Sequence, residues 1–157
     1  MEAEIASFLG KYTPELRRTF AAARVKMRVL FPRGFELVYD NYNALVFGYS
    51  ATERASAALV SIAGYPKWVT LFFLKGSVLA DPTRRLEGSG KTVRGIRLAS
   101  PETLDEPDVK ALLVDAMRSQ TSAFAQAPAL RTVVKSVSGK QRPRRPAKPS
   151  ATKAGRV

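Results

Sequence analysis

The chain has 157 residues, of which 45% are hydrophobic and 25% are charged, a balance typical of one globular domain with a short extension. It contains no cysteine and no histidine, which excludes disulfide bonds, Cys or His metal sites, Ser-His-Asp triads and histidine general bases. Its 26 Lys and Arg residues outnumber 13 Asp and Glu residues, giving a net charge of +13. These values favour a small basic protein that is not an enzyme.

The distribution of apolar residues predicts a cytoplasmic protein. Residues 1–4 carry no positively charged leader, and the longest apolar stretches, such as residues 69–74, have the length of a strand. A helix that spans a bilayer needs about 20 predominantly apolar residues in a row. We therefore expect neither a secretory signal nor a membrane partner, while the oligomeric state stays open.

Positive charge is concentrated near the C-terminal end. Residues 131–157 hold nine of the basic residues and no acidic one, so residues 1–130 carry a net charge of only +4. From residue 139 onward the chain is rich in proline, lysine and arginine and has almost no bulky apolar side chain, a composition that does not form a packed core. We predict one folded domain over residues 3–138 and a disordered basic tail over residues 139–157.

Capping residues and apolar spacing predict three helices. A short helix covers residues 3–9. The second begins at Thr13-Pro14, residue types typical of an N-cap and a first helical position, carries one apolar stripe and ends before Pro32. The third begins near Pro107, after acidic residues that favour the positive end of a helix dipole.

Five short runs rich in aromatic and β-branched residues predict strands. Their connections are too short for helical crossovers, which favours antiparallel pairing. The fourth run is apolar at both parities, so we expect it in a central position, covered on both faces. The predicted fold is therefore α+β, with helices packed on one face of an antiparallel sheet of about five strands. Residues 128–138 combine helical spacing with strand-favouring valines, and their structure stays open. The five runs are residues 35–39, 44–49, 57–63, 68–75 and 93–98.

Several spaced motifs in residues 36–98 form a recognisable pattern. They are ELVYD at 36–40, NALVFGY at 43–49, LFFLKG at 71–76 and LEGSGK at 86–91, followed by RxIRL at 94–98. The pattern resembles the bacterial domain-of-unknown-function 1801 family, also called the YdhG-like family, over about residues 14–120. The resemblance implies a fold akin to frataxin and no established activity. One relative is described as an intracellular iron chaperone, which makes an iron-binding chaperone or metal carrier the alternative function; we otherwise expect no cofactor.

The segment GSGKT at residues 88–92 predicts a turn before a strand, in place of a nucleotide-binding P-loop. A P-loop needs glycine at position 85, where this chain has arginine, and a helix after the lysine. The turn is either a solvated basic loop or an anion-binding concavity made of backbone N–H groups. The candidate anion-binding residues are Lys75, Arg84, Arg85, Gly88, Gly90, Lys91 and Arg94.

Arg94 has the same strand parity as Ile96 and Leu98, which predicts that its side chain points inward. A buried guanidinium must be paired, and the nearest acids in the sequence are Glu87 and Asp81. The pair would be a structural salt bridge, or Arg94 would face a ligand.

Aromatic residues gather around the early strands at positions 39, 42, 49, 65 and 68. They pack within the sheet with their polar tips in water, or they line a pocket and stack on bases. The aromatic pocket candidates are Tyr39, Tyr49 and Trp68.

Two further charged groups have both structural and functional interpretations. Arg17, Arg24 and Arg28 recur along the second helix, as a solvated face or as a contact for phosphates. Four acidic residues either cap the third helix or hold a divalent cation. We predict no metal site and no catalytic residue. The acidic group is Glu102, Asp105, Glu106 and Asp108.

The tail sequence RPRRP at residues 142–146 resembles an AT-hook without its central glycine, which favours non-specific attraction to nucleic acid over minor-groove recognition. We therefore expect a non-enzymatic binding module for an anionic ligand, with weak, sequence-independent nucleic-acid affinity from its tail. The tail candidates are Lys140, Arg142, Arg144, Arg145 and Lys148.

Overall fold

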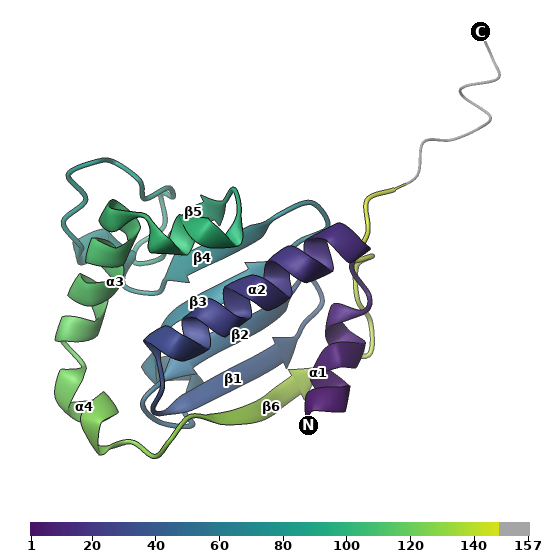
Figure 1. The fold of residues 1–157 in the computed structure, drawn as a ribbon, viewed down its shortest axis with the longest axis horizontal. Coiled ribbons are helices and arrows are strands. Elements are labelled where there is room, and N and C mark those ends of the chain that lie inside the picture. Colours follow the sequence, from purple (N-terminus) through teal and green to yellow (C-terminus); the bar gives the residue numbers. More distant parts are fainter. Residues whose placement is uncertain (148–157) are drawn as a thin grey trace, which may run out of the picture.

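A computed structural model describes residues 1–147 as one six-stranded sheet with helices on one face (Figure 1). The strand order is β5-β4-β3-β2-β1-β6, and neighbours are antiparallel except for the parallel pair of β1 and β6. The predicted α+β class is confirmed, with one strand more than expected. The strands are β1 (Phe35–Asp40), β2 (Leu45–Ser50), β3 (Ala58–Gly64), β4 (Val69–Phe73), β5 (Arg94–Leu98) and β6 (Arg131–Val137).

Each of the five predicted runs forms a strand at nearly its expected bounds, as their aromatic and β-branched residues favour. In β4, Val69, Leu71 and Phe73 are buried, whereas Thr70 and Phe72 are only half-buried. The expectation that this strand is covered on both faces is therefore wrong. Phe72 points to the face of the sheet opposite to that of Val69, Leu71 and Phe73, which pack in the core with α2.

Three of the four α-helices among the described residues also follow their sequence signals. The helices are α1 (Glu2–Leu9), α2 (Pro14–Leu30), α3 (Pro107–Arg118) and the unpredicted α4 (Thr121–Gln126). Thr13 caps α2 as expected, since its hydroxyl accepts a hydrogen bond from the Leu16 backbone N–H at 3.2 Å. Figure 1 shows α2 lying across the sheet. Phe20 on this helix packs so closely on Gly64 of β3 that a Cβ at position 64 would overlap its ring.

Residues 131–137, whose structure the sequence left open, form the edge strand β6 beside β1. The approach to β6 is held by Gly34, whose backbone N–H donates to the Pro128 carbonyl at 2.7 Å. Gly34 has φ 102°, and a Cβ there would collide with the Ser50 carbonyl, so this turn requires glycine. The valines of residues 131–137 form a strand because β1 offers an unpaired edge beside them.

Tyr12, between α1 and α2, joins the helical layer to the ends of two strands. Its hydroxyl donates to the Gly64 carbonyl at 2.7 Å and accepts from the Leu45 backbone N–H at 3.1 Å. Burial raises the pKa of Tyr12 to about 12, so the hydroxyl stays protonated and able to donate. The start of α2 is thereby fixed against the β3–β4 turn.

A buried carboxylate on β1, Glu36, organises the middle of the fold. It accepts hydrogen bonds from Arg24 at 2.7 Å and Arg28 at 2.6 Å on α2, from Tyr49 at 2.8 Å and from Thr132 at 2.8 Å. Burial by itself raises the pKa of Glu36. Hydrogen bonds from Arg24, Thr132 and Tyr49 and the positive charge of Arg24 lower it by more than burial raises it, so the net pKa lies below its ordinary value. The interpretation of Arg24 and Arg28 as a solvated or phosphate-binding stripe is wrong, because both bind this carboxylate.

We expect Glu36→Gln to lower the free energy of unfolding by about 3–5 kcal/mol, because it leaves Arg24 buried without its counter-charge. The control is Glu2→Gln. The Glu2 side chain is 74% exposed and is a weaker partner of Arg24. We expect a change within about 0.5 kcal/mol for this control. Urea unfolding followed by circular dichroism measures both, and equal effects would contradict the assigned role of Glu36.

The stability of the wild-type chain should also depend on acid pH through Glu36. A carboxylate with a lowered pKa in the folded state contributes stability that is fully present above its unfolded pKa and is lost as pH falls through the folded pKa. The unfolding free energy of the wild type should therefore fall below about pH 4, and Glu36→Gln should show a shallower fall. Parallel slopes in urea titrations at several pH values would contradict this.

Candidate functional site

Residues 139–147 pack against the folded body. Arg144 is only 4% exposed, and its guanidinium donates to the Asp40 carboxylate at 2.9 Å and to the Asn41 carbonyl at 2.5 Å. The prediction of a disordered tail is wrong for residues 139–147, because a buried carboxylate 104 residues away supplies a partner that composition does not reveal. Residues 148–157, including the candidate Lys148, lie outside the described residues.

Asp40 gathers a second cation and an amide. Lys11 Nζ lies 2.6 Å from the Asp40 carboxylate and also donates to Gln141 Oε1 at 2.9 Å. Gln141 Nε2 in turn donates to the Asp40 carbonyl at 3.0 Å. Burial raises the pKa of Asp40, but hydrogen bonds from Lys11, Arg144 and Gln141 outweigh it, so the pKa lies below its ordinary value. We call these residues, Lys11, Asp40, Gln141 and Arg144, the Asp40 clamp.

The Asp40 clamp holds the C-terminal segment beside the β3–β4 turn, and an open groove of about 880 Å³ lies between them. Its charged lining residues are Lys67, Arg142 and Arg145, and no acidic residue lines it. Tyr65, Trp68 and three prolines supply flat apolar surface. We call this the Trp68 groove; it is lined by Asn43, Tyr65, Pro66, Lys67, Trp68, Arg142, Pro143, Arg145, Pro146 and Ala147.

Cations lie against aromatic rings at and around the Trp68 groove. The guanidinium of Arg97 on β5 lies 3.8 Å from the centroid of the Trp68 ring, and that of Arg142 lies 5.5 Å from the Tyr42 ring. The Tyr65 and Trp68 ring centroids are 6.0 Å apart. The site therefore alternates positive charge with stacking surface.

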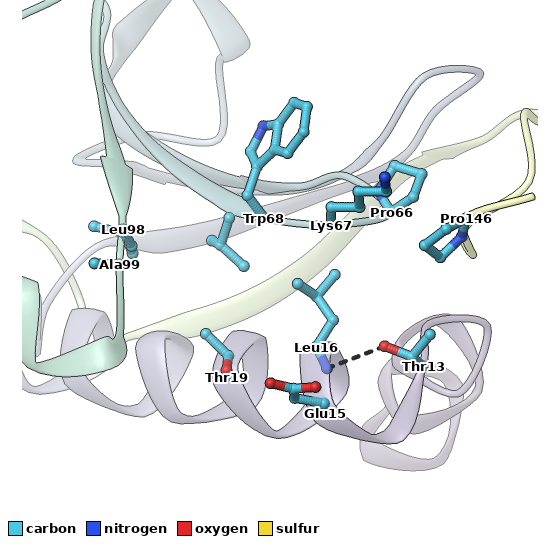
Figure 2. Close-up of a pocket in the computed structure, with 11 residues that line it drawn as sticks. Thr13, Glu15, Leu16, Thr19, Pro66, Lys67, Trp68, Leu98, Ala99 and Pro146 are labelled. Carbon is cyan, nitrogen blue, oxygen red and sulfur yellow. Dashed lines mark hydrogen bonds between the residues drawn. The ribbon is translucent and has the colours of Figure 1, made fainter.

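A second cavity of about 370 Å³ adjoins the Trp68 groove and shares Pro66, Lys67, Trp68 and Pro146 with it. Figure 2 shows Glu15, Leu16 and Thr19 of α2 lining it, while the Trp68 indole points away from that helix. Because Glu15 brings a carboxylate into this cavity, an anion is better placed in the Trp68 groove.

The three predicted aromatic candidates do not converge. Tyr49 is fully buried and donates to Glu36 at 2.8 Å, and its pKa is raised, first by burial and then by that carboxylate. The Tyr39 hydroxyl is buried and makes no hydrogen bond among the described residues, and burial raises its pKa. Only Trp68 of the three lines the groove.

The tail candidates divide into two roles. Arg142 and Arg145 are exposed and line the Trp68 groove, and Lys140 is exposed. Arg144 is a buried member of the Asp40 clamp, so the prediction that it contacts nucleic acid is wrong. Sequence reasoning also missed Lys67 and Arg97. Lys67 had a signal in its position beside Trp68, whereas Arg97 needs the register of β4 and β5.

The candidate residues of the predicted anion-binding loop make separate contacts with other parts of the protein. Arg85 binds Glu106 at 2.8 Å and Asp108 at 3.1 Å, so its charge is neutralised by acids. These pairs, with Lys26 and Asp105 at 2.6 Å, also account for three members of the acidic group. Within residues 1–147, no cluster of three acidic side chains is arranged to hold a metal ion.

Arg94 is half-buried and donates to the carbonyls of Gly90 at 2.6 Å and Val93 at 2.8 Å. The prediction that it pairs with Glu87 or Asp81 is wrong, because the Asp81 carboxylate instead accepts from the backbone N–H groups of Arg85 and Leu86. Arg94 therefore closes the glycine turn.

The turn itself leads into β5, as predicted, and no helix follows Lys91. Gly88 has φ 130°, as expected of this turn, whereas Gly90 does not have a positive φ. Arg84 and Lys91 are exposed, and Lys75 lines a separate groove with Phe73 and Val78. The seven candidates therefore do not form one site.

We expect Asp40→Asn to raise the rate of tryptic cleavage between Arg144 and Arg145 by at least tenfold, because loss of a charged hydrogen bond of about 1.5–3 kcal/mol releases the buried Arg144. The control is Asp115→Asn, which removes an exposed pair with Arg118 on α3. Mass spectrometry follows the cleavage, and cleavage after the buried Arg24 reports global unfolding separately. An unchanged rate at Arg144 would contradict the role of the clamp.

No helix among residues 1–147 has the length and apolar character needed to cross a membrane. No family model matches the chain, and neither a curated protein nor a solved structure is detectably similar to it. The resemblance to the YdhG-like family therefore stays a prediction, and the geometry of the Trp68 groove carries the functional argument.

Proposed function

We propose that the protein is a non-enzymatic binding module that holds an anionic, phosphate-bearing ligand in the Trp68 groove. The observation that carries this proposal is the lining of the groove, which has three cationic side chains and no acidic one. No salt bridge among the described residues engages Lys67, Arg142 or Arg145. Their charge is therefore available to a ligand.

The contacts of the arginines support this proposal. Arg145 uses its Nε to donate to the Lys11 carbonyl at 3.2 Å, which positions the side chain and leaves its terminal nitrogens for another acceptor. Arg142 is anchored through its backbone N–H, which donates to the Tyr42 carbonyl at 2.8 Å. A cation held in this way loses less conformational entropy on binding a phosphate than one on a free tail.

The alternative function, an iron carrier, needs a group of free carboxylates. That alternative rests on the family resemblance, and three of the four acids near α3, Asp105, Glu106 and Asp108, are paired with Lys26 and Arg85. Positive charge and aromatic surface at the Trp68 groove favour an anion, so the first function is the one we propose.

The double variant Arg142→Gln/Arg145→Gln should weaken binding of medium-chain inorganic polyphosphate by at least tenfold at low salt, because phosphate contacts act through charge. The slope of log affinity against log salt concentration should become less steep by about one per lost contact. Fluorescence of Trp68, the single tryptophan of the chain, measures both quantities.

The matched control is Arg84→Gln/Lys91→Gln, which removes the same charge from two exposed residues of the glycine loop. A chain that ends at Ala147 tests the basic residues beyond the groove. We expect both to keep most of the affinity. A loss in either control as large as in the groove variant would contradict the proposed site.

A further inference from the structure

Flat aromatic rings and cations alternate along the Trp68 groove and its rim. Trp68 is paired with Arg97, and Tyr42 is paired with Arg142. Tyr65 lies beside Trp68, with Lys67 in the same turn. Cations alone suffice for a simple phosphate, whereas these rings add surfaces suited to a ligand that carries both phosphates and flat bases.

We infer that the ligand is a single strand of nucleic acid, whose bases stack at Tyr65 and Trp68 and whose phosphates contact Lys67, Arg142 and Arg145. This inference rests on the proposed function and names the ligand of the same site. Stacking on protein rings requires bases that are not already stacked within a duplex, so it selects an unpaired strand.

The exposure of the rings fits this ligand. Tyr42 is 43% exposed, and Tyr65 and Trp68 are half-buried, so each ring is held by the fold while part of it faces solvent. Tyr49, by contrast, is fully buried in the core and offers no surface to a base. Arg97 braces the Trp68 ring by a cation–π contact, and this position allows it to meet a phosphate that follows the stacked base.

The positions of charged side chains indicate where the nucleic-acid strand would run. The adjoining cavity contains Glu15, which repels a phosphate. We therefore place the strand over the Trp68 side of the β3–β4 turn, between the C-terminal segment and Arg97 on β5. None of these contacts reads the hydrogen-bonding edge of a base, so binding should be tolerant of sequence.

The test compares four probes at equal phosphate concentration: a deoxythymidine strand of about ten nucleotides, an abasic strand of the same length, the corresponding duplex, and polyphosphate. We expect quenching of Trp68 fluorescence by the base-containing strand and an affinity at least tenfold above that for the abasic strand, since stacked bases contribute substantially. Equal affinity for all four would overturn this inference and leave the proposed function standing. Binding of none would overturn both.

Variants separate stacking from charge when fluorescence anisotropy of labelled strands is measured. Trp68→Leu should lose at least fivefold in affinity for the thymidine strand and change little for the abasic strand, and Trp68→Phe should restore most of the loss. The control is Phe72→Leu, a half-buried ring of β4 that does not line the Trp68 groove. An equal loss of both ligands in Trp68→Leu, with the unfolding midpoint unchanged, would overturn the stacking role.

Discussion

The salt bridge between Asp40 and Arg144 is the contact on which the candidate site depends. Both side chains are removed from water, and a charge buried in this way is tolerated only when its partner is present. Asp40 stands at the end of β1, and Arg144 belongs to a proline-rich segment with almost no apolar side chains of its own. The segment is held by this ionic contact and its surrounding hydrogen bonds, and residues of the segment form one side of the Trp68 groove.

Two carboxylates on one face of β1 have related roles in the fold. Glu36 and Asp40 are four residues apart, so they point to the same side of the strand, with Val38 between them in the core. Glu36 binds arginines of α2 and a hydroxyl of β6, and Asp40 binds Lys11 and the C-terminal segment. The ion pairs of β1 thus connect segments that are distant in the sequence to a strand that lies beside the edge strand β6.

Docking of the C-terminal segment changes what its basic residues can contact. A free basic tail attracts any polyanion weakly, through charge alone. Docking of residues 139–147 uses one arginine as a structural anchor and places two others beside the aromatic residues of the β3–β4 turn. Positive charge and stacking surface then lie at one place, which is the physical basis of the proposed preference among anions.

Local elements were predictable from the sequence because their signals are local. Thr13-Pro14 caps α2 through a contact three residues away, and the strands follow from the aromatic and β-branched residues within each run. Trp68, Arg142 and Arg145 were recognisable as candidate binding residues by their chemistry alone. That they share one groove was not recognisable, because no spacing rule connects residues 68 and 142.

Tertiary structure decided the partners of the charged residues. Parity predicted that Arg94 points inward, but the Asp81 carboxylate bonds its own loop, and Arg94 binds carbonyl oxygens in its place. Composition predicted that residues 139–147 stay unpacked, yet Arg144 reaches a carboxylate buried at the far end of β1. The sequence by itself determined three of the four α-helices and five of the six strands among the described residues, and the excess of positive charge. Only the folded chain decided which cations are neutralised and which stay free, because ionic partners are selected by proximity in space and by burial.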